Sequence, residues 1–218
     1  MTTAPMGLRE SKKHETRQLI SAHATRLFMA QGFEATTVAE IATAARVAKK
    51  TVSNYFPRKE DLALDHHEEF VASLARALDA RAPGESALAA LRRGFEAAAR
   101  DHDPVAGFAG PEFSRMIADS PTLTARLRDL HDLREDALAR ALAAATDADP
   151  ADIAPRCAAA QLGAAHRLLF RRIQELTLAG HDNASIAAAV IEDAAHVFGA
   201  LEPSLADYAT RAAEPSPA

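Results

Sequence analysis

The chain has 218 residues, of which 48% are hydrophobic, and a formal net charge of −5. Its length and composition predict a globular protein with a real core. The single cysteine, Cys157, excludes an internal disulfide and a cysteine-rich zinc site, and no run of 18 apolar residues could span a membrane. The first 17 residues lack the apolar run of a secretory signal. We therefore expect a soluble, cytoplasmic protein with no membrane partner.

The charge is unevenly distributed along the chain. Residues 1–60 hold ten Lys or Arg and five Glu, a balance of +5, so the remainder carries −10. A cationic first quarter favours a polyanionic partner, because a local positive face attracts phosphates whatever the total charge. Chance segregation of solvated surface charge explains the asymmetry equally well.

Apolar residues recur at helical spacing and β-branched alternation is absent, which predicts an all-α fold of about nine helices. A first helix is expected over residues 12–31, with Gly32 as its C-terminal cap. A short helix should begin after the N-cap Thr37, and a second should span about 48–55 after a turn at Arg46. Two short helices joined by a tight turn, residues 37–56, predict a helix-turn-helix. The inward face of the first helix should hold Leu19, Ile20, Ala24, Leu27 and Phe28.

Longer helices are expected over residues 58–80, 85–100, 121–145, 156–179 and 184–200. Glycines and prolines should interrupt the segment between residues 101 and 113. Ser120 followed by Pro121 is typical of a helix start, and the tail from Glu202 should be loosely held. These elements predict a three-helix head over residues 12–72 and a helical body over residues 73–218.

The second short helix carries side chains suited to DNA. With Val52 facing inward, its outward residues offer charged, hydroxyl and amide groups. Lysine can meet phosphates or guanine, asparagine can bond adenine, and the threonine methyl can meet thymine. We therefore infer double-stranded DNA as the partner. The outward residues are Lys49, Lys50, Thr51, Ser53 and Asn54.

The stretch TTVAEIATAARVAKKTVSNYFPRKEDL, residues 36–62, resembles the helix-turn-helix of the TetR family of bacterial transcriptional regulators. The resemblance covers roughly residues 12–65. It implies that Lys50, Thr51, Ser53, Asn54 and Tyr55 approach bases or phosphates, and that Thr37 and Lys59 hold the DNA backbone.

Three residues depart from the family pattern. Arg46 stands where glycine is frequent; a positive φ there would cost roughly 1 to 2 kcal/mol, although the side chain could reach a phosphate. Arg58 replaces a serine cap, with a loss of about 1 kcal/mol. Ser53 replaces a frequent tyrosine.

A further resemblance, carried by LRESKKHETRQLI and NYFPRKEDL, is to an actinobacterial subgroup of mycofactocin-system and acyl-CoA-responsive regulators. It implies a fatty-acyl or acyl-CoA effector.

No catalytic or metal-binding pattern is present, so we expect no enzyme, no metal and no permanent cofactor. The adjacent His66 and His67 are typical of a solvated helix face, since neighbouring helical residues point in different directions. His131 and His166 could touch a ligand, although satisfied core or surface histidines are the commoner case. Cys157 is interpreted as structural, with oxidant sensing as the alternative.

The helix expected over residues 156–179 carries one apolar stripe and the last long helix carries two, and a helix that is apolar on two sides is expected to be buried on two sides. One side would cover the core and the other would pair with a second subunit in a four-helix bundle, as the family resemblance also implies. A monomer that buries both sides is the alternative. The expected interface comprises Leu162, Leu169, Ile173, Ile186, Val190, Val197 and Leu201.

Large apolar side chains among alanine-rich helices predict an elongated, mostly apolar cavity, with a fully packed core as the alternative. The expected lining is Phe95, Phe108, Phe113, Met116, Ile117, Leu127, Leu130, His131, His166 and Phe170. Together these features predict a homodimeric repressor that a small hydrophobic, acyl-type effector releases from a palindromic operator. A small-molecule binding or carrier protein with a degenerate DNA-binding head is the alternative.

Overall fold

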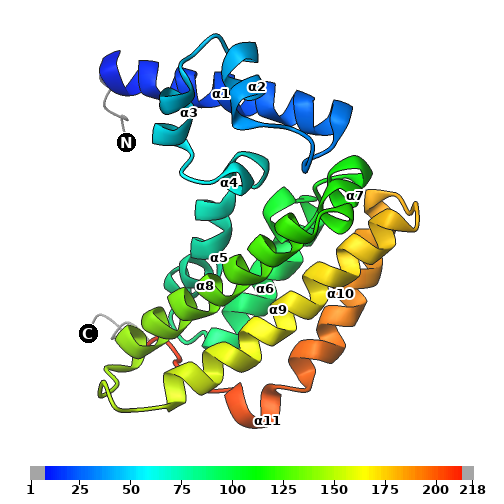
Figure 1. Cartoon of the computed structure of the whole chain (residues 1–218). Helices are drawn as coiled ribbons and strands as arrows, with labels where there is room; N and C mark the ends of the chain where they lie inside the picture. Colours follow the sequence, from blue (N-terminus) through cyan, green and yellow to red (C-terminus); the bar gives the residue numbers. More distant parts are fainter. Residues whose placement is uncertain (1–7, 213–218) are drawn as a thin grey trace. The chain divides into compact units, whose positions relative to one another are not determined.

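The computed structural model describes residues 8–212 and is all-helical over that range, as predicted (Figure 1). The described residues form eleven α-helices and a short 3-10 turn, η1. The helices are α1 (Leu8–Gln31), α2 (Val38–Ala44), α3 (Lys49–Tyr55), α4 (Lys59–Ala63), α5 (His67–Asp79), α6 (Ala87–Arg100), η1 (Pro104–Ala106), α7 (Pro111–Asp119), α8 (Pro121–Thr146), α9 (Ala154–Leu178), α10 (Asn183–Gly199) and α11 (Glu202–Leu205).

The chain divides into two compact units. The first, called the head, contains the residues up to Asp65 together with Arg115–Arg126; the second, called the body, contains His66–Ser114 and the residues from Leu127 onward. The chain passes between the units three times. The first passage is a non-helical turn, whereas the other two lie inside α7 and α8. The boundary predicted between residues 72 and 73 stays a prediction.

The head is built on α1, which buries Ile20, Ala24 and Phe28 and ends at Gly32, as its glycine predicted. Gly32 has φ of +86°, a conformation that glycine adopts without a Cβ clash. Leu19, expected on the inward face, is 46% exposed. From α7 and α8, Ile117 and Leu123 are buried in the same unit.

The continuous helix predicted over residues 58–80 is wrong. The chain forms α4 and α5 instead, and the helical conformation breaks at Leu64, where φ is −103° and ψ is +53°. No proline or glycine occurs between residues 58 and 80, so the sequence gives no local signal for this break. The element that follows the helix-turn-helix is therefore two helices with a joint at Leu64, not one helix.

The body has a single apolar core made by α5, α6, α8, α9 and α10. Helix α10 packs against both α9 and α6 (Figure 1). Side-chain oxygens cap three helices at the expected places: Ser86 accepts from Ala89 N before α6, Ser120 from Leu123 N before α8, and Asp182 from Ser185 N before α10.

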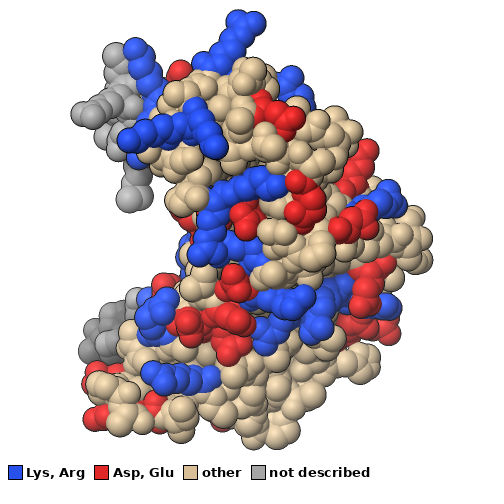
Figure 2. All heavy atoms as spheres, viewed as in Figure 1, with Lys and Arg blue, Asp and Glu red and all other residues tan. Residues whose placement is uncertain are grey.

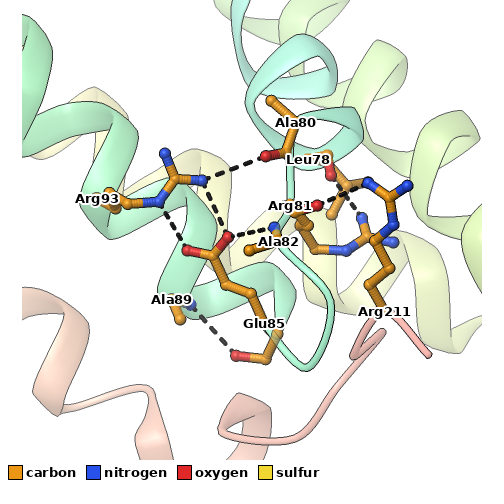
Figure 3. A network of polar contacts seen from close by, with 9 residues as sticks. Leu78, Ala80, Arg81, Ala82, Glu85, Ala89, Arg93 and Arg211 are labelled. Atoms are coloured by element: carbon orange, nitrogen blue, oxygen red, sulfur yellow. Dashed lines mark hydrogen bonds and ion pairs between the residues drawn. The ribbon is translucent and has the colours of Figure 1, made fainter. Parts of the chain in front are cut away.

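The chain after α10 is held against the body through Arg211, although the sequence predicted a loose tail. Gly84 N donates to Arg211 O at 2.9 Å, and Arg211 N donates to Glu85 O at 3.0 Å. Figure 3 shows the Arg211 guanidinium donating to Arg81 O, at 2.7 Å, beside the Glu85–Arg93 ion pair. Paired main-chain bonds of this kind fix both segments, so the loop after α5 and residues near Arg211 order each other.

Candidate functional site

The helix-turn-helix is present at the predicted residues, with α2 and α3 in contact. Thr37 caps α2: its hydroxyl accepts from Glu40 N at 3.2 Å, and its own N–H donates to the Glu40 carboxylate at 2.7 Å. The Thr37 hydroxyl also donates to this carboxylate at 2.8 Å, and the two bonds donated by Thr37, from its N–H and its hydroxyl, favour the charged form and lower the pKa of Glu40. This capping box fixes the start of the first helix of the pair.

Arg46 forms the turn between α2 and α3 with φ of +55°. A side chain in this left-handed region costs roughly 1 to 2 kcal/mol relative to glycine. The sequence raised this possibility, and the structure shows that the strained conformation is adopted. The Arg46 side chain is exposed, so its guanidinium is free to reach solvent or a phosphate.

Helix α3 buries one side chain and exposes a row of polar ones. Val52 is completely buried and anchors the helix, while Thr51 and Tyr55 are half-buried at its sides. The exposed side chains are Lys49, Lys50, Ser53 and Asn54. A seven-residue helix held by one buried valine therefore presents two ammonium groups, a hydroxyl and a carboxamide on one surface.

Lys59 was predicted to hold the DNA backbone, but its ammonium group is engaged inside the head. Its Nζ donates to Phe33 O at 2.9 Å, to Thr36 O at 3.0 Å and to Glu34 O at 3.4 Å. It also lies 4.2 Å from the centroid of the Phe33 ring. Since an ammonium has three protons, these bonds use its whole donor capacity and make Lys59 a tie between α4 and the loop after α1.

Arg58, before α4, provides no side-chain cap, as its departure from the serine pattern predicted. It is exposed and leaves α4 without the hydroxyl acceptor that would bond its first turn.

Lys and Arg side chains gather over α1 to α3 in Figure 2, in agreement with the +5 balance of residues 1–60. A surface of this kind attracts nucleic-acid phosphates.

The body contains a cavity of about 170 Å³ lined by α5, α6, the η1 segment, α8 and α9. Of the residues predicted to line an effector site, Phe95, His166 and Phe170 lie on its wall. Phe108 and Leu130 are buried elsewhere in the body, and Met116 and Ile117 belong to the head. The predicted residues absent from this wall are Phe108, Phe113, Met116, Ile117, Leu127, Leu130 and His131.

The cavity surface is mostly apolar, and charged and polar groups from three segments also line it. Arg134 of α8, His166 of α9 and Asp103 before η1 all line the wall. The first two are 6% and 5% exposed, and Nε of Arg134 and Nε2 of His166 are buried without a hydrogen-bond partner. Sequence reasoning named His166 and missed the other two.

Burial decides the charge states around this cavity. Desolvation lowers the pKa of Arg134 to about 9, and the Asp103 carboxylate opposes that change, so the guanidinium is cationic at neutral pH. Desolvation, with the Arg134 charge second, lowers the pKa of His166 well below 6.5. His131, packed edge-on against Phe70 and Phe170, has its pKa lowered to about 3 by the same two causes. Both histidines are neutral at pH 7.

Most of the residues predicted for a dimer interface are buried within the chain itself. Five of them, Leu162, Leu169, Ile173, Ile186 and Val190, are 0–1% exposed because α9 and α10 use them against the chain's own core. Val197 and Leu201 are half-buried against the same core. Both helices expose charged residues, among them Arg171 and Glu192, and they also expose a set of small and apolar residues that differs from the predicted one. This set includes Ala160, Ala164, Leu168, Ala188 and Ala195.

Within residues 8–212, no three His, Cys, Asp or Glu side chains are placed to hold a metal ion. His66 bonds the Glu69 carboxylate at 3.0 Å on an exposed surface, and Cys157 is exposed. No helix in the described range has the length and apolar character needed to cross a membrane.

Comparison with known proteins connects this geometry to a family. The profile described as bacterial regulatory proteins, tetR family, matches residues 20–65. The HTH-type transcriptional regulator TcmR of Streptomyces glaucescens is 33% identical over 171 residues, which are 76% of each chain.

Two solved structures have the same fold at lower identity. NalD, the secondary repressor of the MexAB-OprM multidrug efflux pump in Pseudomonas aeruginosa, has a TM-score of 0.53 and 19% identity and covers 84% of this chain and 97% of its own. A TetR-family regulator from Streptomyces coelicolor has a TM-score of 0.51 and 21% identity, covering 91% and 99%.

Proposed function

This chain belongs to the TetR family of bacterial transcriptional regulators and is not an enzyme, and from that premise we propose that it is a homodimeric repressor that a small molecule releases from a palindromic operator. Such a role requires a surface that reads DNA, a site that binds the effector, a second subunit and a route between the units. It also places the protein in the bacterial cytoplasm.

The observation that carries the proposal is the exposed polar surface of α3. Lys50 and Asn54 lie four residues apart and therefore on one side of the helix, and both are exposed. Lysine and asparagine can bond guanine and adenine edges, while Lys49 and Arg46 supply charge for phosphates. Lys59 is left out of this set because its protons are bonded within the head.

The cavity in the body supports a ligand-responsive role. It is lined by side chains from five segments, so a bound molecule would contact all of them at once. Its volume of about 170 Å³ falls short of the 300 Å³ or more that drug-sized ligands occupy. An acyl-CoA chain, the effector predicted from sequence, would need a longer and more apolar space than this one.

The signal would pass through α7 and α8. These are the two helices among the described residues that continue from one unit into the other, whereas the joint at Leu64 interrupts the α4–α5 connection. Helix α8 contributes Arg126 to the head and Arg134 to the wall of the cavity. This route does not depend on the single helix predicted over residues 58–80, which the chain does not form.

The second subunit would pair through the exposed side of α9 and α10. Alanines with Leu168 at the middle allow helices of two subunits to approach closely. An isologous pair of this kind is two-fold symmetric, so the operator should carry half-sites separated by one helical turn, about 34 to 36 Å, or a small multiple.

Selection of bound fragments from the protein's own genome, followed by titration at several salt concentrations, tests the proposal. The expected result is one palindrome bound at least a thousandfold more tightly than random DNA at physiological salt. A carrier protein with a degenerate head would bind all fragments weakly and alike, with only the electrostatic salt dependence. That outcome would reject the repressor and favour the alternative.

A further inference from the structure

The body cavity contains a buried cation without a partner. Arg134 is 6% exposed, its Nε is buried without a hydrogen-bond partner, and none of the described residues accepts a hydrogen bond from its guanidinium. Its Cζ lies 4.5 Å from the centroid of the Phe70 ring, which gives a weak attraction and no acceptor. A buried guanidinium in this condition is costly to maintain, because its solvation is lost and no anion replaces it.

A second unpaired polar atom belongs to the same wall. Nε2 of His166 is buried without a partner, and the ring is held edge-on between Phe95 at 5.9 Å and Phe198 at 5.4 Å. Because His166 is neutral, Nε2 can donate one hydrogen bond in the appropriate tautomer.

The one acidic group on the wall is already engaged. Asp103 accepts a hydrogen bond from Val105 N at 2.8 Å and caps η1 with that carboxylate. It stands at no ion-pair distance from Arg134 among the described contacts, although its charge stabilises the guanidinium from further away. The guanidinium of Arg134 is therefore available to pair with an anion that enters the cavity.

The size and surface of the cavity restrict that molecule. A cavity of about 150 Å³ lined by aliphatic and aromatic side chains is known to bind benzene, and this one measures about 170 Å³. Leu91, Phe95 and Phe170 provide the apolar wall. One six-membered ring with a small charged substituent fits this volume.

We propose that the cavity binds a small aromatic carboxylate of about the size of benzoate, with its carboxylate on Arg134 and His166 and its ring against Phe95 and Phe170. The inference rests on the proposed function in that the same cavity would be the effector site. A carboxylate supplies the anion and acceptors that the guanidinium and Nε2 lack, and the two-oxygen geometry suits an arginine fork. Without a ligand, the unpaired charge makes the cavity a weak point of the body.

The test uses the full chain, with benzoate as the probe and benzamide as its uncharged analogue, measured by calorimetry. Benzoate should bind, and benzamide should bind at least tenfold more weakly because it provides no charge. Arg134→Met keeps the length of the side chain and should weaken benzoate at least tenfold. Arg140→Met, an exposed arginine of the same helix, is the control and should bind as the parent does.

Melting of the ligand-free variants separates a ligand-binding arginine from a structural one. Removing an unpaired buried charge should leave the melting temperature of Arg134→Met unchanged or raised, whereas a structural arginine would lower it. Failure of benzoate and its ring-substituted homologues to bind, or equal binding by Arg134→Met, would overturn the inference.

Operator binding by the ligand-free protein is measured separately. If the operator is bound and benzoate is not, this inference fails and the repressor proposal stands. If benzoate binds without releasing the operator, the carboxylate site stands and the ligand response of the proposed function fails.

Discussion

Asp61 of α4 and Arg126 of α8 form a buried ion pair within the head, with Oδ1 and the guanidinium nitrogen Nη2 2.9 Å apart. The two residues are separated by 65 positions in the sequence, and their side chains are 6% and 12% exposed. Nε of Arg126 donates to the same oxygen at 3.3 Å. The pair joins the segment after the helix-turn-helix to the helix that continues into the body.

Arg126→Met should destabilise the head strongly, because it leaves the Asp61 carboxylate buried without a partner. Losing one member of a buried pair lowers the free energy of unfolding by about 3 to 5 kcal/mol. Urea denaturation of the variant and the parent measures this difference. The double variant Asp61→Leu with Arg126→Met removes both charges and should recover most of that loss. A loss below about 1 kcal/mol in the single variant would show that the pair contributes little.

Lys50 and Lys59 should behave differently despite their identical chemistry. Lys50→Ala should reduce the preference for the operator over random DNA, since its ammonium is exposed on α3. Lys59→Met should lower the melting temperature and leave the salt slope of DNA binding unchanged, since three carbonyls lose their donor. Lys49→Ala is the control for a simple phosphate contact and should reduce the slope by about 1. A reduced salt slope of DNA binding for Lys59→Met would show that Lys59 contacts the DNA backbone.

Arg46→Gly should stabilise the head by about 1 kcal/mol, because glycine adopts the positive φ of this turn without strain. Arg46→Ala removes the same charge but keeps a Cβ in the strained conformation. Equal DNA affinities with different melting temperatures in the two variants would separate the role of the guanidinium from that of the turn. Equal melting temperatures would argue that the turn carries no strain.

Leu168→Glu should break the dimer, because this side chain is 52% exposed at the middle of the proposed pairing surface. Sedimentation should give a monomer mass for the variant and a dimer mass for the parent. Leu133→Glu is the matched control, since Leu133 on α8 is 44% exposed and lies outside that surface. A Leu168→Glu protein that remains dimeric would place the interface on other residues.

Acidification should destabilise the body through its buried neutral histidines. In the folded chain His131 and His166 have pKa values below the 6.5 of an unfolded histidine. Below pH 6.5 these two side chains therefore bind protons in the unfolded chain but stay neutral in the folded chain, which favours unfolding. Each histidine should therefore cost about 1 kcal/mol between pH 6.5 and pH 5.5. His131→Phe, which keeps the ring between Phe70 and Phe170, should remove about half of this pH dependence in thermal melts. His181→Gln changes an exposed histidine and should not alter it.

Local chemistry made the helix limits predictable from sequence. Gly32, Ser120 and Asp182 act within one turn of their own positions, through a backbone conformation or a side-chain oxygen. The α3 surface was predictable for the same reason, since one inward valine determines which neighbours point outward. The break at Leu64 was not, because no proline or glycine near it marks the end of a helix.

The cavity and the pairing surface depended on contacts that periodicity cannot resolve. Arg134 lies four residues from both Leu130 and Leu138, which are buried on α8. Residues at this spacing share one side of a helix, so the position of Arg134 in the sequence indicated that it would be buried. On α10, two apolar stripes correctly predicted burial on two sides. The two helices that cover these sides of α10 are α9 and α6 of the same chain. The large apolar residues of α10 are therefore buried in the body core and are not available to a second subunit.

The discontinuous head affects how its parts can be inherited and exchanged. Because Arg115–Arg126 belongs to the head, a ribosome must translate more than half of the chain before the Asp61 carboxylate can meet its cation. Recombination at residue 65 with a foreign reading head that has no acid at position 61 would leave the Arg126 guanidinium buried without its partner. Such chimaeras should tolerate a crossover only where the replacement includes both segments, which ties the evolution of the operator-reading surface to the beginning of α8.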